Sequence, residues 1–264
     1  MSSDSLLIDQ DARGIVRLTL NRPRVHNALD EELIERLAGA FERIGQDPMA
    51  RVVVLGATGR TFCAGADIAW MQRAARRTEA ENFEDARRFA AMMHAAAQCA
   101  KPVIARVQGP AFGGGVGLAC VADIVIATPL ARFAVTEARL GILPAVIGPY
   151  LVNALGSRQA RRLALTCAAV PALEALSLGL VHQVVQESEL ETAIDACIVD
   201  LLQGGPQAQV AIKDLFGALP VGPVTDETRR DTAWTLSQVR ASEEARAGFE
   251  AFMAKRRAPW APQG

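Results

Sequence analysis

The pattern of hydrophobic and polar residues predicts a series of strands and helices in the first half of the chain. Alternation in residues 6–10 and 15–21 predicts two strands joined by a turn. Asp30 can cap a helix that continues to residue 44, with apolar side chains at helical spacing. The β-branched run at residues 52–55 predicts a buried strand. A loop rich in small residues follows that strand directly.

The same order of elements then repeats. Residues 79–99 have the pattern of a long helix, and residues 103–107 and 124–127 have the pattern of strands. A further helix is expected to begin near Gly114, between those two strands. Recurring strand–loop–helix units predict an α/β fold class, with loops gathered at strand ends where sites form. We therefore expect an α/β core in residues 1–188.

The last quarter of the chain has a different pattern. Residues 190–202 carry one apolar helical face, and further helical segments surround Ile212, Trp234 and Phe252. Helices with apolar faces need a partner surface, which can be their own core or another subunit. We expect residues 189–264 to form a helical region.

Composition and charge narrow the classes of function. The chain has 264 residues and a formal net charge of −1, which gives no overall field that attracts nucleic acid. No apolar stretch has the unbroken length of a membrane span, and the N-terminus lacks the pattern of a signal peptide. Five scattered cysteines form no CxxC pair, which fits a reducing compartment. We expect a cytoplasmic protein without a metal site, a membrane anchor or bound nucleic acid.

Two loops rich in small residues are the candidate functional segments. They are residues 61–68 (TFCAGADI) and residues 108–118 (QGPAFGGGVGL). Small residues leave backbone N–H groups uncovered, and glycine lets the chain bring them close to a ligand. The second loop runs into a predicted helix, so its N–H groups lie at the positive end of a dipole. Neither loop has the Rossmann or Walker A spacing, and Cys63 has no paired base to make it a nucleophile.

Taken together, the two loops resemble the paired signature of the crotonase (enoyl-CoA hydratase/isomerase) family. The segments FCAGADI and QGPAFGGGVGLACVADI match its two oxyanion-hole segments, and the similarity extends from Asn21 to Arg256. The resemblance implies a spiral of ββα repeats, with the C-terminal helices building a homotrimer or a dimer of trimers. It also implies an acyl-CoA thioester substrate and no separate cofactor, since coenzyme A is part of the substrate.

The resemblance also implies roles for individual residues. The backbone amides of Ala66 and Gly114 correspond to the family's oxyanion hole, where one preset donor is commonly worth ~3 kcal/mol in the barrier. Of the two glutamates common in the family's hydratases, the first corresponds to Gly117 and the second to Glu137. Glu137 is therefore the candidate acid/base, since an apolar pocket can raise the pKa of a carboxylate. The positions that correspond to coenzyme A binding are Asn27, Ala28, Ala64, Ala66, Asp67, Ile68, Gly114, Lys255 and Arg256. Asp67 also has a structural interpretation, as an anchor of its loop.

The single glutamate makes the chain similar to the methylglutaconyl-CoA hydratase branch, as do residues 63–72 and 142–147. Bacterial members of that branch act in leucine and acyclic terpene breakdown. The resemblance implies hydration of a 2-enoyl-CoA that is branched or carries a distal carboxylate. Two alternatives stay open: an enoyl-CoA isomerase using one glutamate, and a non-catalytic CoA- or RNA-binding protein. Cations that could bind a distal carboxylate, among which the sequence does not choose, are Arg73, Arg76, Arg77, Arg87 and Arg88.

Overall fold

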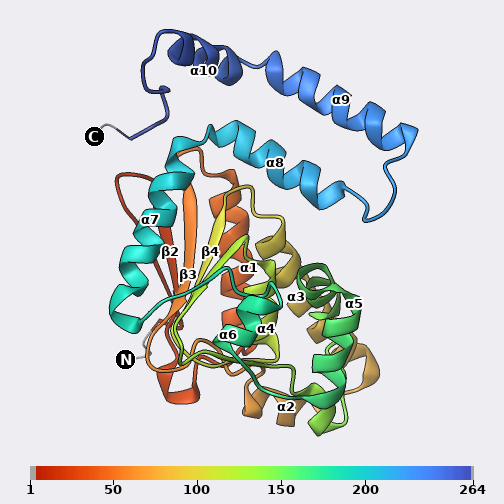
Figure 1. Ribbon diagram of the computed structural model, residues 1–264. Coiled ribbons are helices and arrows are strands. Elements are labelled where there is room, and N and C mark those ends of the chain that lie inside the picture. The colour runs from red at the N-terminus through yellow and green to blue at the C-terminus, as the bar shows by residue number, and fades with distance from the viewer. Residues whose placement is uncertain (1–3, 263–264) are drawn as a thin grey trace. The chain divides into compact units, whose positions relative to one another are not determined.

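Six strands form the main sheet, in the order β1-β2-β3-β4-β6-β9 (Figure 1). The structure, a computed structural model, describes residues 4–262. β1 pairs with β2 antiparallel, and the other neighbouring strands run parallel. The strands of this sheet are β1 (Leu6–Gln10), β2 (Ile15–Leu20), β3 (Val52–Ala57), β4 (Val103–Val107), β6 (Ile124–Ala127) and β9 (Gln183–Val184).

A smaller sheet contains three strands in the order β5-β7-β8. The chain passes from β4 in the main sheet to β5 in the small one, and again from β6 to β7. Each passage is followed by a helix, which gives the repeated ββα organisation that the family resemblance implies. The strands of the small sheet are β5 (Ala111–Phe112), β7 (Arg132–Ala134) and β8 (Val170–Pro171).

Helices cover the main sheet, and α1 and α3 pack against each other beside it (Figure 1). Asp30 begins α1 by accepting a hydrogen bond from the Leu33 amide, and Thr78 begins α3 with a capping box. α4 packs against both α3 and α5. The helices before residue 190 are α1 (Glu31–Gln46), α2 (Ile68–Ala74), α3 (Glu79–Ala97), α4 (Gly114–Val121), α5 (Gly148–Thr166) and α6 (Ala172–Ser177), with 3-10 turns η1 (Pro23–Val25), η2 (Glu137–Leu140) and η3 (Glu187–Glu189).

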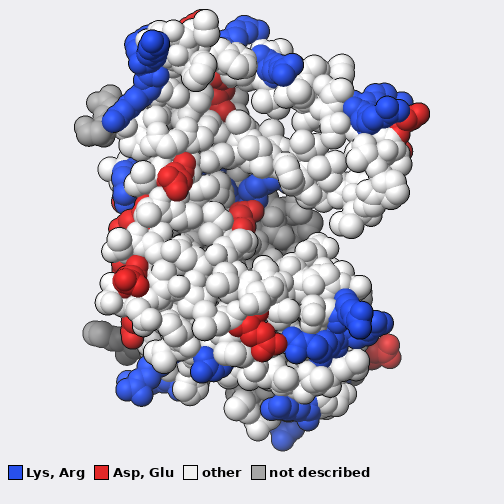
Figure 2. Space-filling model, viewed as in Figure 1, with Lys and Arg blue, Asp and Glu red and all other residues white. Residues whose placement is uncertain are grey.

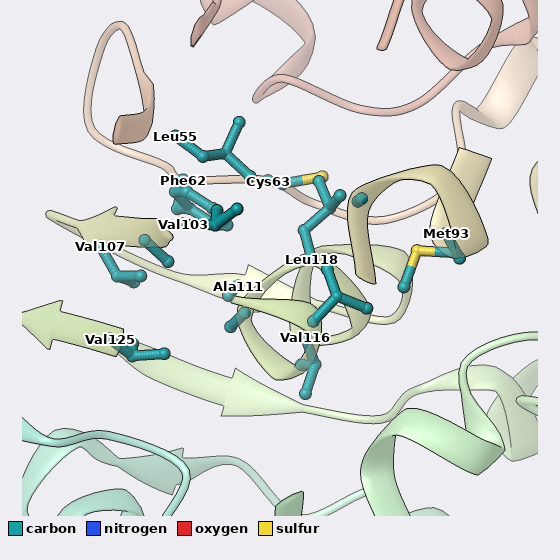
Figure 3. Packing of buried hydrophobic residues seen from close by; sticks show 14 of the residues in the cluster. Leu55, Phe62, Cys63, Met93, Val103, Val107, Ala111, Val116, Leu118 and Val125 are labelled. Atoms are coloured by element: carbon teal, nitrogen blue, oxygen red, sulfur yellow. The ribbon is translucent and has the colours of Figure 1, made fainter. Parts of the chain in front are cut away.

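The core lies where the sheet meets α4 and the first small-residue loop. Figure 3 shows Phe62 and Cys63 next to Leu55 of β3 and Leu118 of α4. Phe62, Cys63 and Leu118 are fully buried. Because a close-packed interior resists displacement, this packing fixes the loop and the start of α4 relative to each other.

The chain divides into two compact units, Met1–Asp195 and Ala196–Gly264. The division falls inside α7 (Leu190–Gln203), a few residues after the boundary expected at residue 188. The second unit contains the end of α7 with α8 (Pro206–Ala218), α9 (Asp226–Arg240) and α10 (Glu243–Met253). Its helices expose large apolar side chains, among them Phe216, Trp234 and Phe252. No helix in residues 4–262 is long and apolar enough to cross a bilayer.

Candidate active site

The first small-residue loop is pinned to Leu29 by two backbone hydrogen bonds. The Leu29 amide donates to the Gly65 carbonyl at 2.7 Å, and the Asp67 amide donates to the Leu29 carbonyl at 2.8 Å. These bonds flank Ala66, so the N–H of Ala66 faces away from Leu29. Within residues 4–262 this N–H donates to no backbone carbonyl outside the regular elements. It is therefore available to a ligand.

The second loop approaches the first because glycine stands at the contact. Gly113 has φ 49° and ψ −118°, a backbone conformation that glycine adopts readily. A Cβ atom on Gly65 would lie 2.8 Å from the Phe112 carbonyl oxygen, so any other residue there would separate the loops. Gly114 is the first residue of α4. Its N–H has no intrahelical partner and lies at the positive end of the helix dipole.

Both loops line one cavity of about 320 Å³, which Glu137 also lines. The walls of the cavity come from α2, α3 and the segment 140–147. Most of the lining is apolar, with Asp85 and Glu137 as its charged residues. The structure thus brings Ala66, Gly114 and Glu137, far apart in sequence, to one cavity.

The carboxylate of Glu137 is poorly solvated and incompletely hydrogen-bonded. Its Oε2 atom is buried and has no hydrogen-bond partner among the described residues. Burial raises the pKa of Glu137, although backbone hydrogen bonds from Glu137 and Thr136 act in the opposite direction. Its Oε1 atom lies 3.1 Å from where a Cβ on Gly113 would be. A carboxylate with a raised pKa beside the second loop is suited to proton transfer.

Gly117, at the position of the family's first glutamate, has no room for a side chain. A Cβ there would lie 2.4 Å from Cγ2 of Ile147 and 3.0 Å from Cε of Met93. Both neighbours are buried. The site is thus built around Glu137 without a second carboxylate at residue 117.

Asp67 anchors the first loop. Its Oδ1 atom accepts hydrogen bonds from the amides of Ala69 at 2.8 Å and Trp70 at 3.3 Å. Its Oδ2 atom accepts from the Arg22 guanidinium at 3.0 Å, and Arg22 also pairs with Asp30 at 2.8 Å. Burial acts to raise the pKa of Asp67, but these hydrogen bonds hold it below its usual value. Asp67 is therefore ionised and occupied in holding the residues around Ala66.

Asn27, expected to contact coenzyme A, has its side chain inside the protein. Its Nδ2 atom donates to the carbonyls of Thr58 and Thr61, both at 2.8 Å, and its Oδ1 atom accepts from the Arg22 amide at 2.8 Å. Asn27 and Ala28 are both buried. The Asn27 side chain therefore shapes the loop, and its contact with coenzyme A stays a prediction.

The other expected coenzyme-binding residues lie in different settings. Ala64 lines the cavity, and its amide donates to the His26 carbonyl. Ile68 begins α2 with a side chain that is 70% exposed. Lys255 and Arg256 follow α10 in the second unit, both exposed. Their binding to coenzyme A stays a prediction.

The arginines considered for a distal carboxylate are mostly paired with acids. Arg73 and Arg77 both pair with Glu31, and Arg77 and Arg88 also pair with Asp85. Arg87 pairs with an acid one turn away on α3. None of the five arginines lines the cavity that contains Glu137.

Cys63 and His26 have settings that do not favour nucleophilic or metal chemistry. Cys63 is fully buried, and burial raises the pKa of its thiol to about 12, so it is not a thiolate at neutral pH. His26 contacts the Thr61 hydroxyl through Nδ1 at 3.1 Å. Residues 4–262 contain no group of three or more His, Cys, Asp or Glu that could hold a metal ion.

The sequence interpretation missed one wall of the cavity. Trp70 and Phe89 line it with their rings edge to face, 6.4 Å apart at 88°. Asp85 lies one turn before Phe89 on α3 and accepts a hydrogen bond from the Trp70 indole N–H at 3.0 Å. The four-residue spacing of Asp85 and Phe89 indicated a shared face, but nothing in the sequence indicated that Trp70 would meet it.

Comparisons with known proteins identify the family and the fold. A family model described as enoyl-CoA hydratase/isomerase matches residues 10–263. The chain is similar to an enoyl-CoA hydratase from Shewanella pealeana, with a TM-score of 0.94, 35% identity and coverage of 97% of this chain and 96% of that one. An enoyl-CoA hydratase from Mycobacterium smegmatis gives a TM-score of 0.90 with 33% identity, covering 98% and 99% of the two chains. A carnitinyl-CoA dehydratase from Salmonella typhi is 32% identical over 270 aligned positions, 98% of each chain. The protein has the crotonase fold and belongs to the enoyl-CoA hydratase/isomerase family.

Proposed function

We propose that this protein adds water across the 2,3 double bond of a 2-enoyl-CoA. One observation carries the proposal: Ala66, Gly114 and Glu137 line a single cavity, and the buried Oε2 of Glu137 has no hydrogen-bond partner among the described residues. Conjugation makes C3 of such a thioester electrophilic. Attack at C3 moves negative charge onto the thioester oxygen, where preset N–H donors lower the barrier most effectively.

In the mechanism we propose, one carboxyl group handles both proton transfers. Glu137 takes a proton from water as the water oxygen bonds to C3, and the π electrons move to the thioester oxygen. The amides of Ala66 and Gly114 stabilise the resulting enolate. The enolate then collapses, and the Glu137 carboxyl returns the proton to C2. The net change is addition of H and OH on one face of the double bond, with Glu137 ionised again.

The acyl group that we propose is branched and uncharged. Sequence similarity to the methylglutaconyl-CoA hydratase branch supports the branching, since a β-methyl group suits the apolar wall. A distal carboxylate has less support, because the charged residues of the described lining are both acids, Asp85 and Glu137. Taking an ionised group out of water without a partner is costly. We therefore expect a methylglutaconyl-like substrate, which carries a distal carboxylate, to be a poorer substrate than an uncharged branched one.

Isomerisation of a 3-enoyl-CoA is the second candidate, and the packing around Gly117 favours it. Moving a proton from C2 to C4 needs one carboxylate and no activated water. Because residue 117 has no space for a carboxylate, a single-acid reaction has a structural basis here. Both reactions place negative charge on the thioester oxygen: hydration through the enolate of a 3-hydroxyacyl-CoA, and isomerisation through a conjugated dienolate.

The face shown in Figure 2 gives no support to RNA binding. On the face shown in Figure 2, basic and acidic side chains lie in separate small groups among uncharged ones. The formal net charge is −1. Proteins that bind nucleic acid through phosphates need a continuous basic patch.

We also propose that the chain assembles as a homotrimer or a dimer of trimers. The exposed Phe216, Trp234 and Phe252 of the second unit support an interface, because exposed apolar patches mark contact surfaces. Sedimentation equilibrium tests this proposal directly. A monomer at micromolar concentration would contradict it.

A substrate panel and one substitution test the chemistry. Purified protein is given but-2-enoyl-CoA, 3-methylbut-2-enoyl-CoA, 3-methylglutaconyl-CoA and hex-3-enoyl-CoA, and products are identified by mass spectrometry. We expect water addition to the 3-methylbut-2-enoyl compound. Glu137→Gln is expected to lower kcat by about 100- to 10,000-fold, the usual contribution of acid–base catalysis, with affinity for a saturated acyl-CoA nearly unchanged.

Glu42→Gln, at an exposed position on α1, serves as the matched control and should retain full turnover. Conversion of hex-3-enoyl-CoA without hydration of any 2-enoyl-CoA would favour the isomerase. Full turnover by Glu137→Gln would remove Glu137 from either mechanism.

A further inference from the structure

A second cavity lies directly behind the wall of the first. It has a volume of about 450 Å³ and is lined by residues of α1 and α3 together with Trp70. Its lining combines the apolar Ile34, Ala38 and Ala91 with the charged Glu31, Glu35 and Arg88. Trp70 and Asp85 line both cavities. This pair is therefore the partition between the candidate acyl cavity and the cavity between α1 and α3.

The partition is held by a few specific contacts. The Trp70 indole N–H donates to Oδ2 of Asp85 at 3.0 Å, and the Trp70 ring meets Phe89 edge to face. Asp85 is 7% exposed and is fixed in turn by Arg77. The indole hydrogen bond and the ion pair with Arg77 meet at the same Asp85 oxygen, so they hold the Trp70 ring in place together. These contacts favour the conformation in which Trp70 separates the two cavities.

The element that carries Trp70 is lightly attached. α2 has seven residues, and none of them is buried. Its contacts to the rest of the first unit include the Asp67 cap at its start and the Trp70 side chain. A helix with few buried contacts opens locally at a low free-energy cost. Movement of the indole therefore requires the loss of its packing at the edge of the core and of the Arg73–Glu31 pair, but not of any fully buried side chain of α2.

We propose that Trp70, latched by Asp85, limits the length of the acyl chain that this enzyme accepts. In the closed state Trp70 ends the acyl cavity, and a short or branched acyl group fits in front of it. Displacing the indole joins the two cavities and gives a longer chain the apolar surface of Ile34, Ala38 and Ala91, which lies between charged side chains at the cavity's edge. The inference rests on the proposed enoyl-CoA function and adds the residue that sets its range of substrates.

Three substitutions separate the ring from its latch. Trp70→Ala removes the partition, Trp70→Phe keeps an aromatic ring without the N–H, and Asp85→Asn keeps the shape with a weaker acceptor. For each, kcat/KM is measured with but-2-enoyl-CoA and dodec-2-enoyl-CoA. The ratio of the two values does not depend on the fraction of active enzyme, so a partly folded variant still gives an answer.

We expect Trp70→Ala to raise the kcat/KM ratio of dodec-2-enoyl-CoA to but-2-enoyl-CoA at least about tenfold. A tenfold change is the low end of the discrimination that one methylene group gives in a hydrophobic pocket. Trp70→Phe and Asp85→Asn should raise it less. Phe83→Ala, which removes an exposed ring from α3 outside either cavity, is the matched control and should leave the ratio unchanged.

Binding of saturated butanoyl-CoA and dodecanoyl-CoA, measured by calorimetry, gives the same ratio without chemistry. If no variant turns over any enoyl-CoA but Trp70→Ala shifts the affinity ratio, the hydratase proposal fails and the chain-length inference stands. If turnover is present and both ratios stay at the wild-type value in Trp70→Ala, the chain-length inference is wrong.

Discussion

Adding a methyl group at Gly117 is expected to destabilise the protein, against the usual effect of alanine in a helix. Alanine normally stabilises a helix interior over glycine by about 0.5–1 kcal/mol. Here the new Cβ would lie 2.4 Å from Cγ2 of Ile147 and 3.0 Å from Cε of Met93, inside the core. Overpacking of this kind costs about 1–3 kcal/mol. The expected net loss for Gly117→Ala is therefore about 1 kcal/mol of unfolding free energy.

Gly39 of α1 supplies the matched control in the same unit. A Cβ there would meet the guanidinium of Arg43 at 3.1 Å, and that flexible side chain can move aside. Gly39→Ala should therefore be neutral or stabilising. Urea denaturation followed by far-UV circular dichroism measures both variants, with the denaturant slope checked for a change in cooperativity.

A double-mutant cycle identifies the contact responsible. Ile147→Ala alone should cost about 2–5 kcal/mol, because it leaves a cavity. In Gly117→Ala with Ile147→Ala the new methyl group fills part of that cavity, so the pair should be less destabilised than the sum by about 1 kcal/mol or more. Contact with Ile147 is not the cause if Gly117→Ala is as stable as Gly39→Ala, or if the effects of Gly117→Ala and Ile147→Ala are additive.

Two further predictions concern the charged groups of the site. Arg22→Met should lower the free energy of unfolding at pH 7 by about 1–3 kcal/mol, because Asp30 and Asp67 both lose their ion-pair partner. The magnitude lies between those of exposed and buried ion pairs, since these side chains are only partly shielded from water. The pKa of Asp67 is depressed, so its contribution to stability is present above its ordinary value of 3.8 and is lost as the pH falls through the folded value. Urea titrations at pH 7 and pH 3 should therefore show a smaller difference in unfolding free energy between wild type and Arg22→Met in acid. An unchanged difference would count against Asp67 as the loop anchor. Burial raises the pKa of Glu137 above 4.5, so the acid limb of the kcat/KM profile should lie above that value as the base becomes protonated, and a limb at or below it would mean that another group is being titrated.

Much of the fold was predictable because the sequence repeats simple patterns. Leu6–Gln10, Val103–Val107 and Ile124–Ala127 are strands with the bounds that alternation and β-branched runs indicate. α5 was not predicted, because Gly156 interrupts the helix with φ 72° and ψ 155° and breaks the apolar period. The strands of the small sheet are only two or three residues long, which is too short for a period to be visible.

The backbone features of the site were also predictable from the sequence, whereas its side-chain contacts were not. Backbone donors leave a trace in the sequence, because only small residues permit the approach of Gly65 to Phe112 and of residue 113 to Glu137. Contacts such as that between Trp70 and Asp85 depend on tertiary packing between α2 and α3, and no local pattern encodes them. The side-chain bonds of Asn27 within its own loop were missed for the same reason.

The residues that line the acyl cavity can change more freely than the main-chain groups proposed to bind the enolate. The proposed enolate donors are main-chain groups held by glycine contacts, by the Arg22–Asp67 pair and by packing around Cys63, so no single side-chain replacement removes a donor without disturbing the core. The residues that bound the acyl group lie instead on α2, on α3 and in the segment 140–147. α2 has no buried residue, so substitutions at its exposed positions carry a small stability cost. Substrate range can therefore drift at Trp70 and its neighbours while the chemistry at the thioester stays fixed by the backbone.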